Sequence, residues 1–315
     1  MSLYETTIQR LAFIKAVYSS AVNQSLSPEP LNCMSLLSFH DAIELFLQLG
    51  SEYLGANASN ANFLDYWEII SKKLSETELQ QKESMRRLNK SRVMLKHHGT
   101  LPSKIDIESF RASATSFFED NTPLVFGIPF STISLIELVA SAEAKHHLKL
   151  AETHIEEKRY KEALEQVALS FDVIIRDYEN SKSAPFYSSP FEFGHDLTFL
   201  DHDFPITDKE EFEGLRRYMK VLTDTLGDMQ SAMKIFALGI DYRRYGRFKY
   251  YVPQVNRAAA GNYQIVWTQR QRSFSFEEVQ FCFDFVIQSA LLLSEFDYDA
   301  PVIEMSIPDT IPSFK

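Results

Sequence analysis

Glycine and cysteine are both scarce in this chain. Ten glycines among 315 residues leave few positions for tight turns, which argues against loop-rich all-β folds and against glycine-dependent nucleotide sites. The two cysteines, Cys33 and Cys282, are too few for a disulfide framework and too far apart in sequence for a metal-binding CxxC pair. We therefore expect two free, buried thiols in a reducing compartment, the cytoplasm.

Long uninterrupted apolar runs are also missing. Residues 1–18 mix polar and apolar positions at helical spacing and lack the apolar core of a signal peptide. The most apolar stretch, 123–141, contains two prolines, several hydroxyl side chains and Glu137. This composition favours a buried loop leading into a helix over a membrane span, so no membrane partner is expected.

Positive charge is in deficit overall but unevenly distributed. The net charge of -11 argues against nonspecific coating of nucleic acid. From Arg86 to Lys104, however, there are six basic residues and no acidic one. From Tyr242 to Phe276, seven Lys or Arg accompany nine aromatic residues, again without Asp or Glu. Either segment could bind an anionic partner although the whole chain is acidic.

Apolar residues are abundant, at 45% of the chain, which indicates a folded protein. In the first 120 residues they recur every three or four positions in five segments separated by short polar breaks. This spacing predicts a compact, all-α, up-down bundle. The helices are expected over 3–24, 34–55, 62–74, 76–97 and 105–120.

The rest of the chain is also expected to be helical. A long helical stretch is predicted over 131–180 with a break near 158–160, and further helices over 211–239 and 275–296. "NYQIVWTQ" (262–269) is typical of a short strand. These patterns suggest three parts. They are a bundle at 1–125, a long helical hairpin or connector at 126–190, and a C-terminal helical unit with the basic and aromatic segment at 191–315.

The sequence "LNKSRVMLKHHGTLPS" (88–103) lies near the end of the fourth predicted helix. Arg92 is followed after four residues by His97 and after five by His98. With the preceding "FHDAIELFLQLG", it resembles the HEPN superfamily of nucleotide-binding helical bundles, whose hallmark is Arg-x(4–6)-His near a helix end. The resemblance covers about residues 1–120. It implies a homodimeric, metal-independent endoribonuclease without a cofactor, with an antiphage or toxin role and two motifs facing each other across the dimer.

The residue types suit that chemistry. An imidazole with a pKa near ~6.5 can remove the proton of the RNA 2′-hydroxyl or protonate the leaving 5′-oxygen. An arginine can stabilise the charge on the phosphorane. Val93 departs from the Asn or Asp that often follows the family's arginine. The predicted catalytic residues are Arg92, His97 and His98, and the predicted RNA-binding residues are Arg86, Arg87, Lys96, Arg243, Arg244 and Arg247.

Alternative interpretations are open for both basic segments. Cations at a helix C-terminus also complement the helix dipole, as at any ordinary helix end. The aromatic rings of 242–276 could stack on RNA bases, or they could belong to the core while the arginines pair with the acidic stretch 192–213. A non-catalytic module that binds RNA, a nucleotide or a protein partner encoded nearby is the alternative function. His40 and Glu44 are expected to make a structural polar contact, and no metal site is expected.

Overall fold

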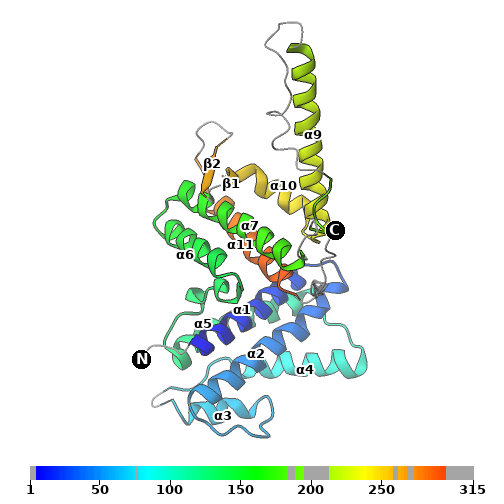
Figure 1. Ribbon diagram of the computed structural model, residues 1–315. Helices are drawn as coiled ribbons and strands as arrows, with labels where there is room; N and C mark the ends of the chain where they lie inside the picture. The colour runs from blue at the N-terminus through cyan, green and yellow to red at the C-terminus, as the bar shows by residue number, and fades with distance from the viewer. Residues whose placement is uncertain are drawn as a thin grey trace, which may run out of the picture. The chain divides into compact units, whose positions relative to one another are not determined.

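The structure is a computed structural model that describes residues 5–74, 77–183, 189–194, 213–257, 262–267 and 273–295. Helices dominate these residues, and one short two-stranded sheet accompanies them (Figure 1). The predicted all-α class is confirmed. The chain divides after Leu138 into two compact units, which are described separately below. None of the described helices is long and apolar enough to cross a membrane.

Unit 1 is built around one central helix. Helices α1, α3, α4 and α5 all pack against α2, whose apolar positions at helical spacing are buried. The elements are α1 (Glu5–Ser25), η1 (Leu31–Met34), α2 (Ser35–Tyr53), α3 (Asp65–Ser71), α4 (Lys82–His98), α5 (Lys104–Phe126), η2 (Phe130–Thr132) and η3 (Leu135–Leu138).

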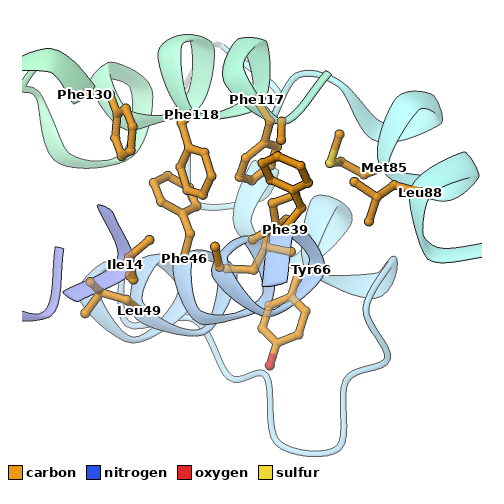
Figure 2. Close-up of a cluster of buried hydrophobic side chains, with 14 of the residues drawn as sticks. Ile14, Phe39, Phe46, Leu49, Tyr66, Met85, Leu88, Phe117, Phe118 and Phe130 are labelled. Atoms are coloured by element: carbon orange, nitrogen blue, oxygen red, sulfur yellow. The ribbon is translucent and has the colours of Figure 1, made fainter. Parts of the chain in front are cut away.

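A cluster of aromatic rings forms the centre of the unit 1 core (Figure 2). The ring of Phe46 on α2 meets those of Phe117 and Phe118 on α5 edge to face, with centroids 5.3 and 5.7 Å apart. Such pairs contribute about 0.5–1.5 kcal/mol beyond the burial of their area. The α2–α5 contact therefore helps to fix the framework on which α4 rests.

Helix α4 is attached to this core by a narrow apolar face. Met85 and Leu88 are fully buried and point toward Phe39 and Phe117 in Figure 2. The helix ends at Gly99, whose φ of 65° is left-handed and suits glycine. The Gly99 N–H donates to the Leu95 carbonyl at 3.1 Å, which satisfies one of the last carbonyls of the helix. The predicted stop at Gly99 is confirmed.

The start of α4 lies later than the sequence predicted, at Lys82 and not at residue 76. The preceding loop is held by hydrogen bonds that a continuous helix could not make. The Trp67 indole donates to the Gln80 carbonyl at 2.9 Å, and the Gln80 N–H donates to the Asn121 side chain at 2.7 Å. These long-range bonds fix residues 79–81 as a connection.

Unit 2 is a helical hairpin with further helices packed on it. Helices α6 and α7 pair along their length, α11 packs against α7, α10 packs against α11, and α9 contacts α10. Strands β1 and β2 form an antiparallel pair in which Gln254 faces Val266. The elements are α6 (Ala142–Glu156), α7 (Tyr160–Lys182), α9 (Glu213–Ala237), α10 (Tyr242–Tyr251), β1 (Gln254–Arg257), β2 (Tyr263–Val266) and α11 (Phe276–Leu293).

The division into parts differs from the one predicted. Phe130 and Ile133 are buried in the unit 1 core, so this unit extends beyond residue 125. Helices α6 and α7 form a hairpin, and α7 packs against α11 within the same unit. The helix predicted from 131 begins only at Ala142, where the Ser141 hydroxyl caps it by accepting the Ala144 N–H at 3.3 Å.

Two further elements of unit 2 bear on the sequence predictions. The strand expected within 262–269 is present as β2. The segment "YRRYGRFKYY", which carried no helix prediction, forms α10. Asp241 caps it, because its carboxylate accepts the N–H groups of Arg243 and Arg244 at 2.8 and 3.0 Å.

Candidate functional site

The α4 helix separates the arginine and the histidines of the proposed motif. Arg92 lies half-buried on the side of α4 that also carries the buried Met85 and Leu88. His97 and His98 are exposed in the last turn. At about 100° per residue, His97 lies roughly 140° around the helix axis from Arg92 in one direction. His98 lies roughly 120° from Arg92 in the other direction. One protomer therefore does not present Arg92 and either histidine on the same face.

A groove of about 320 Å³ lies between α4 and α5. Its α4 wall combines cationic, hydroxyl and apolar side chains, and its α5 wall is mainly polar. The lining residues are Arg87, Lys90, Ser91, Met94, Asp106, Ser109, Phe110 and Ser113.

The two histidines continue the rows of side chains that line this groove. His98 lies seven residues after Ser91 and four after Met94, so it shares their side of the helix. His97 lies seven residues after Lys90 and shares its side. The groove-facing side of α4 thus carries Lys90, Ser91 and Met94 and ends in the exposed imidazoles. This juxtaposition differs from the pairing of Arg92 with His97 that the motif suggests.

The groove retains a surplus of positive charge. Its one carboxylate, Asp106, already accepts hydrogen bonds from the Ser103 N–H at 3.0 Å and the Ser103 hydroxyl at 2.6 Å. The hydroxyl and backbone N–H of Ser103 lower the pKa of Asp106. Arg87 and Lys90 face no second carboxylate in the groove lining. Cations beside serine hydroxyls are the donors that phosphate oxygens accept in nucleic-acid complexes.

The other two predicted RNA-binding residues of α4 lie outside the groove lining. Arg86 is exposed, and its guanidinium is 3.3 Å from the Glu83 carboxylate, a surface pair worth about 0–1 kcal/mol. Lys96 is exposed in the last turn, near the negative end of the helix dipole. Both add positive potential to the helix end without forming part of the groove.

Arg92 has a different neighbour, the buried imidazole of His40 on α2. His40 is 2% exposed and stacks on the Phe63 ring with centroids 4.4 Å apart. Burial lowers the pKa of His40 below its usual value, and the positive charge of Arg92 lowers it further. Glu44 acts in the opposite direction. The sequence offered a signal for this proximity, because Arg92 follows Met85 and Leu88 at helical spacing.

His40 forms the one group of possible metal ligands found among the described residues. Its Nδ1 atom lies 3.7 Å from a carboxylate oxygen of Asp41 and 3.7 Å from one of Glu44. The three ligand atoms all lie within 4.8 Å of one another. The polar contact predicted between His40 and Glu44 is thus part of a three-residue cluster that includes Asp41.

The C-terminal arginines of the prediction sit on α10, and two of them face aromatic rings of α11. The Arg244 guanidinium lies 5.8 Å from the centre of the Phe281 ring, and its Nη1 donates to the Gln288 side chain. Arg247 lies 4.0 Å from the same ring centre. Arg243 is exposed. Contacts with the Phe281 ring therefore engage Arg244 and Arg247, in place of the acidic stretch 192–213 named in the structural alternative. Residues 195–212 of the acidic stretch lie outside the described residues.

Comparison of the chain with protein-family models, with curated proteins and with solved structures found no match. The resemblance to the HEPN superfamily therefore stays a prediction, and the functional argument depends on the residues of the site.

Proposed function

We propose that the chain is a metal-independent endoribonuclease of the HEPN type that acts in the cytoplasm, with its site on α4. The supporting observation is the basic groove lined by Arg87 and Lys90, on the side of α4 whose last turn carries the exposed His97 and His98. This arrangement joins phosphate-binding groups to imidazoles, the side chains that most often serve as general acids and bases.

In the proposed reaction, RNA supplies its own nucleophile. One imidazole accepts the proton of a 2′-hydroxyl, whose oxygen attacks the adjacent phosphorus. The bond from phosphorus to the 5′-oxygen breaks, and a protonated imidazole donates a proton to that oxygen. The products are a 2′,3′-cyclic phosphate and a 5′-hydroxyl. Acid–base help of this kind contributes about 10²–10⁴-fold to the rate.

The basic residues of α4 are proposed to bind phosphates. Arg87 and Lys90 hold the phosphates of the strand that passes the histidines of the same copy. Arg92 projects from another side of α4, so it serves a phosphate held by the histidines of a second copy, as the HEPN resemblance implies for a dimer. A homodimer is thus part of the proposal.

The test is cleavage of labelled RNA by the purified full chain in excess EDTA. Cleavage with cyclic-phosphate ends is expected, with a loss of about 10²–10⁴-fold when the acid–base histidine is replaced by alanine. His97→Ala and His98→Ala are tested singly, beside Arg87→Ala and Arg92→Ala. His146→Ala removes an exposed histidine of unit 2 and is the matched control. Absence of cleavage across varied RNAs, or equal cleavage by all variants, would refute the proposal.

The same variants also allow the proposed toxin or antiphage role to be tested in cells. If the nuclease acts as a toxin or an antiphage effector, expression of the active chain slows growth or limits phage, and the inactive histidine variant does neither. Growth arrest by both chains would separate toxicity from RNA cleavage.

The second candidate is a non-catalytic module that binds RNA, a nucleotide or a protein partner. The groove favours it as much as catalysis, because Arg87, Lys90 and the serine hydroxyls need only an anion to bind. In this case RNA binds, the Arg87→Ala variant binds it more weakly, and no RNA is cleaved. A binding measurement beside the cleavage assay therefore distinguishes the two functions.

A further inference from the structure

Helix α9 carries an apolar stripe that the described residues of unit 2 leave largely exposed, although the Phe236 ring at its end stacks on Tyr242 of α10. Seven large apolar side chains along one side of the helix are each between 41 and 65% exposed. Ile235 is the one buried residue recorded for the 25-residue helix, and it lies on another side. The stripe consists of Leu215, Tyr218, Leu222, Leu226, Met229, Met233 and Phe236.

The spacing of the stripe is that of a coiled-coil seam. Leu215, Leu222, Met229 and Phe236 recur every seven residues and form one row of the seam. Leu226 and Met233, also seven residues apart, form the second row, and Tyr218 flanks the seam. A strict seven-residue repeat keeps one seam of a helix facing a partner helix. A stripe for packing on a globular surface needs no such repeat.

The exposed area is close to that of a specific interface. If a large apolar side chain presents roughly 150–200 Å² when fully exposed, seven that are about half exposed present roughly 500–700 Å². Two copies of the stripe would together bury on the order of 1,000–1,400 Å², which overlaps the range of stable protein interfaces. Monomeric soluble proteins seldom leave such a patch in water.

The polar side of α9 argues against a membrane as the occupant. Arg216, Arg217 and Lys220 are followed by Asp224 and Asp228, so both signs of charge share the helix. Helices that lie on anionic membranes are usually rich in Lys and Arg on the polar face. Asp228 also accepts a contact from Lys249 at 3.5 Å.

We propose that the α9 stripe binds the α9 stripe of a second copy of this chain, forming a two-helix coiled coil. The proposal uses unit 2 and makes no use of α4. Because the RNase proposal also needs a second copy, a monomer would contradict both proposals, whereas a dimer that Leu222→Asp does not weaken would contradict this one alone.

The test is the mass of the full chain by sedimentation equilibrium over a range of concentrations. The wild type should pass from 36.3 kDa to twice that mass as concentration rises. Leu222→Asp should raise the dissociation constant at least tenfold. Ser231→Asp adds the same charge on the opposite, exposed side of α9 and should leave it unchanged. Circular dichroism checks that both variants stay folded.

Three outcomes of the sedimentation measurement would overturn the proposal. They are a monomer at ~100 μM, a dimer that Leu222→Asp does not weaken, and equal weakening by both variants. Flotation with vesicles of phosphatidylcholine and phosphatidylserine tests the alternative occupant. Wild-type binding that Leu222→Asp abolishes would assign the stripe to a membrane and also overturn self-association.

A second, independent observation concerns the His40 cluster of unit 1. Neither ring nitrogen of the buried His40 has a hydrogen-bond partner with good geometry among the described residues, although Asn89 lies beside the ring. Buried polar atoms without partners are rare in folded proteins. His40 Nδ1 lies 3.7 Å from a carboxylate oxygen of Asp41 and 3.7 Å from one of Glu44. An ion equidistant from three atoms at such separations lies about 2.0–2.4 Å from each, which spans Zn²⁺ and larger divalent ions.

The geometry points to a divalent-cation site formed by His40, Asp41 and Glu44. One imidazole and two carboxylates suit a first-row transition metal such as Zn²⁺ or Mn²⁺. The Arg92 guanidinium opposes a cation, and the two carboxylates together outweigh its single charge. A bound ion would lie near Arg92, the arginine of the proposed motif. It would take no part in the proposed RNA cleavage, which is expected to proceed in EDTA.

Calorimetric titration of the full chain with ZnCl₂ tests this site. Asp41→Asn and Glu44→Gln should each remove one class of sites or weaken it at least tenfold. Glu108→Gln, which changes an exposed carboxylate of α5, should bind as the wild type does. Zn²⁺ should also raise the melting temperature of the wild type more than that of Glu44→Gln. Identical titrations of all four proteins would overturn the proposal.

Discussion

The attachment of α4 to unit 1 yields a quantitative prediction. Met85 and Leu88 are the buried side chains of this helix, and the rest of it is exposed or half-buried. Leu88→Ala removes a fully buried side chain beside the aromatic core. Such a change costs about 2.7–5 kcal/mol, and we expect a loss of about 3 kcal/mol in the free energy of unfolding of unit 1.

The matched control lies on the same helix. Val93 is 37% exposed whereas Leu88 is fully buried, so Val93→Ala removes less buried surface than Leu88→Ala and adds a residue with better helix propensity. The expected change is within about 0.5 kcal/mol. The difference between the two variants therefore measures the burial of Leu88 alone.

Tryptophan fluorescence can follow unit 1 separately. The chain has two tryptophans, Trp67 in unit 1 and Trp267 in unit 2, so a Trp267→Phe background leaves one reporter. Trp67 is buried and its indole is hydrogen-bonded to the loop before α4. Urea titration should show a lower midpoint for Leu88→Ala with an unchanged slope. A loss below 1 kcal/mol, or equal losses for Leu88→Ala and Val93→Ala, would refute the docking of α4.

Three other predictions rest on the burial or the contacts of individual side chains. Burial raises the pKa of Cys282 to about 12 and also raises that of Cys33, so neither thiol should react with a disulfide reagent at pH 8 until the protein is denatured. Arg247→Ala should lower the melting temperature of unit 2 by removing a cation–π contact worth about 0.5–2 kcal/mol, whereas Arg243→Ala should change it little. Ser103→Ala should destabilise unit 1 by about 1 kcal/mol in urea titration, because it removes the capping box of α5.

The sequence predicted most helices of unit 1 because their signals are local. In α2, apolar residues at helical spacing such as Phe39, Ile43 and Phe46 are all buried. Gly99 marks the end of α4 by its left-handed conformation. The start of α4 was misplaced because Asn121 and Trp67, which are distant in sequence, bind the preceding loop.

The site required information that no local pattern contains. The groove exists because α5 brings Ser109 and Ser113 to the cationic side of α4, and helix pairing is not encoded in either segment alone. The separation of Arg92 from His97, by contrast, follows from five residues at the helical period. The Arg-x(4–6)-His motif states only the number of residues between Arg92 and His97. The rotation between the two side chains becomes clear once the helix is known to continue through both.

The two basic segments look alike in sequence but differ in what surrounds them. On α10, Arg244 and Arg247 are taken up by the rings of α11, and a guanidinium that lies on a ring has less freedom to follow an RNA backbone. On α4, Arg87 and Lys90 face a groove whose one carboxylate is held by Ser103. Apart from the exposed Arg243 of α10, the predicted RNA-binding residues that an anionic ligand can use therefore lie on α4. The choice between catalysis and binding then depends on the imidazoles that end the same helix, which makes the His97 and His98 variants more informative than any charge reversal.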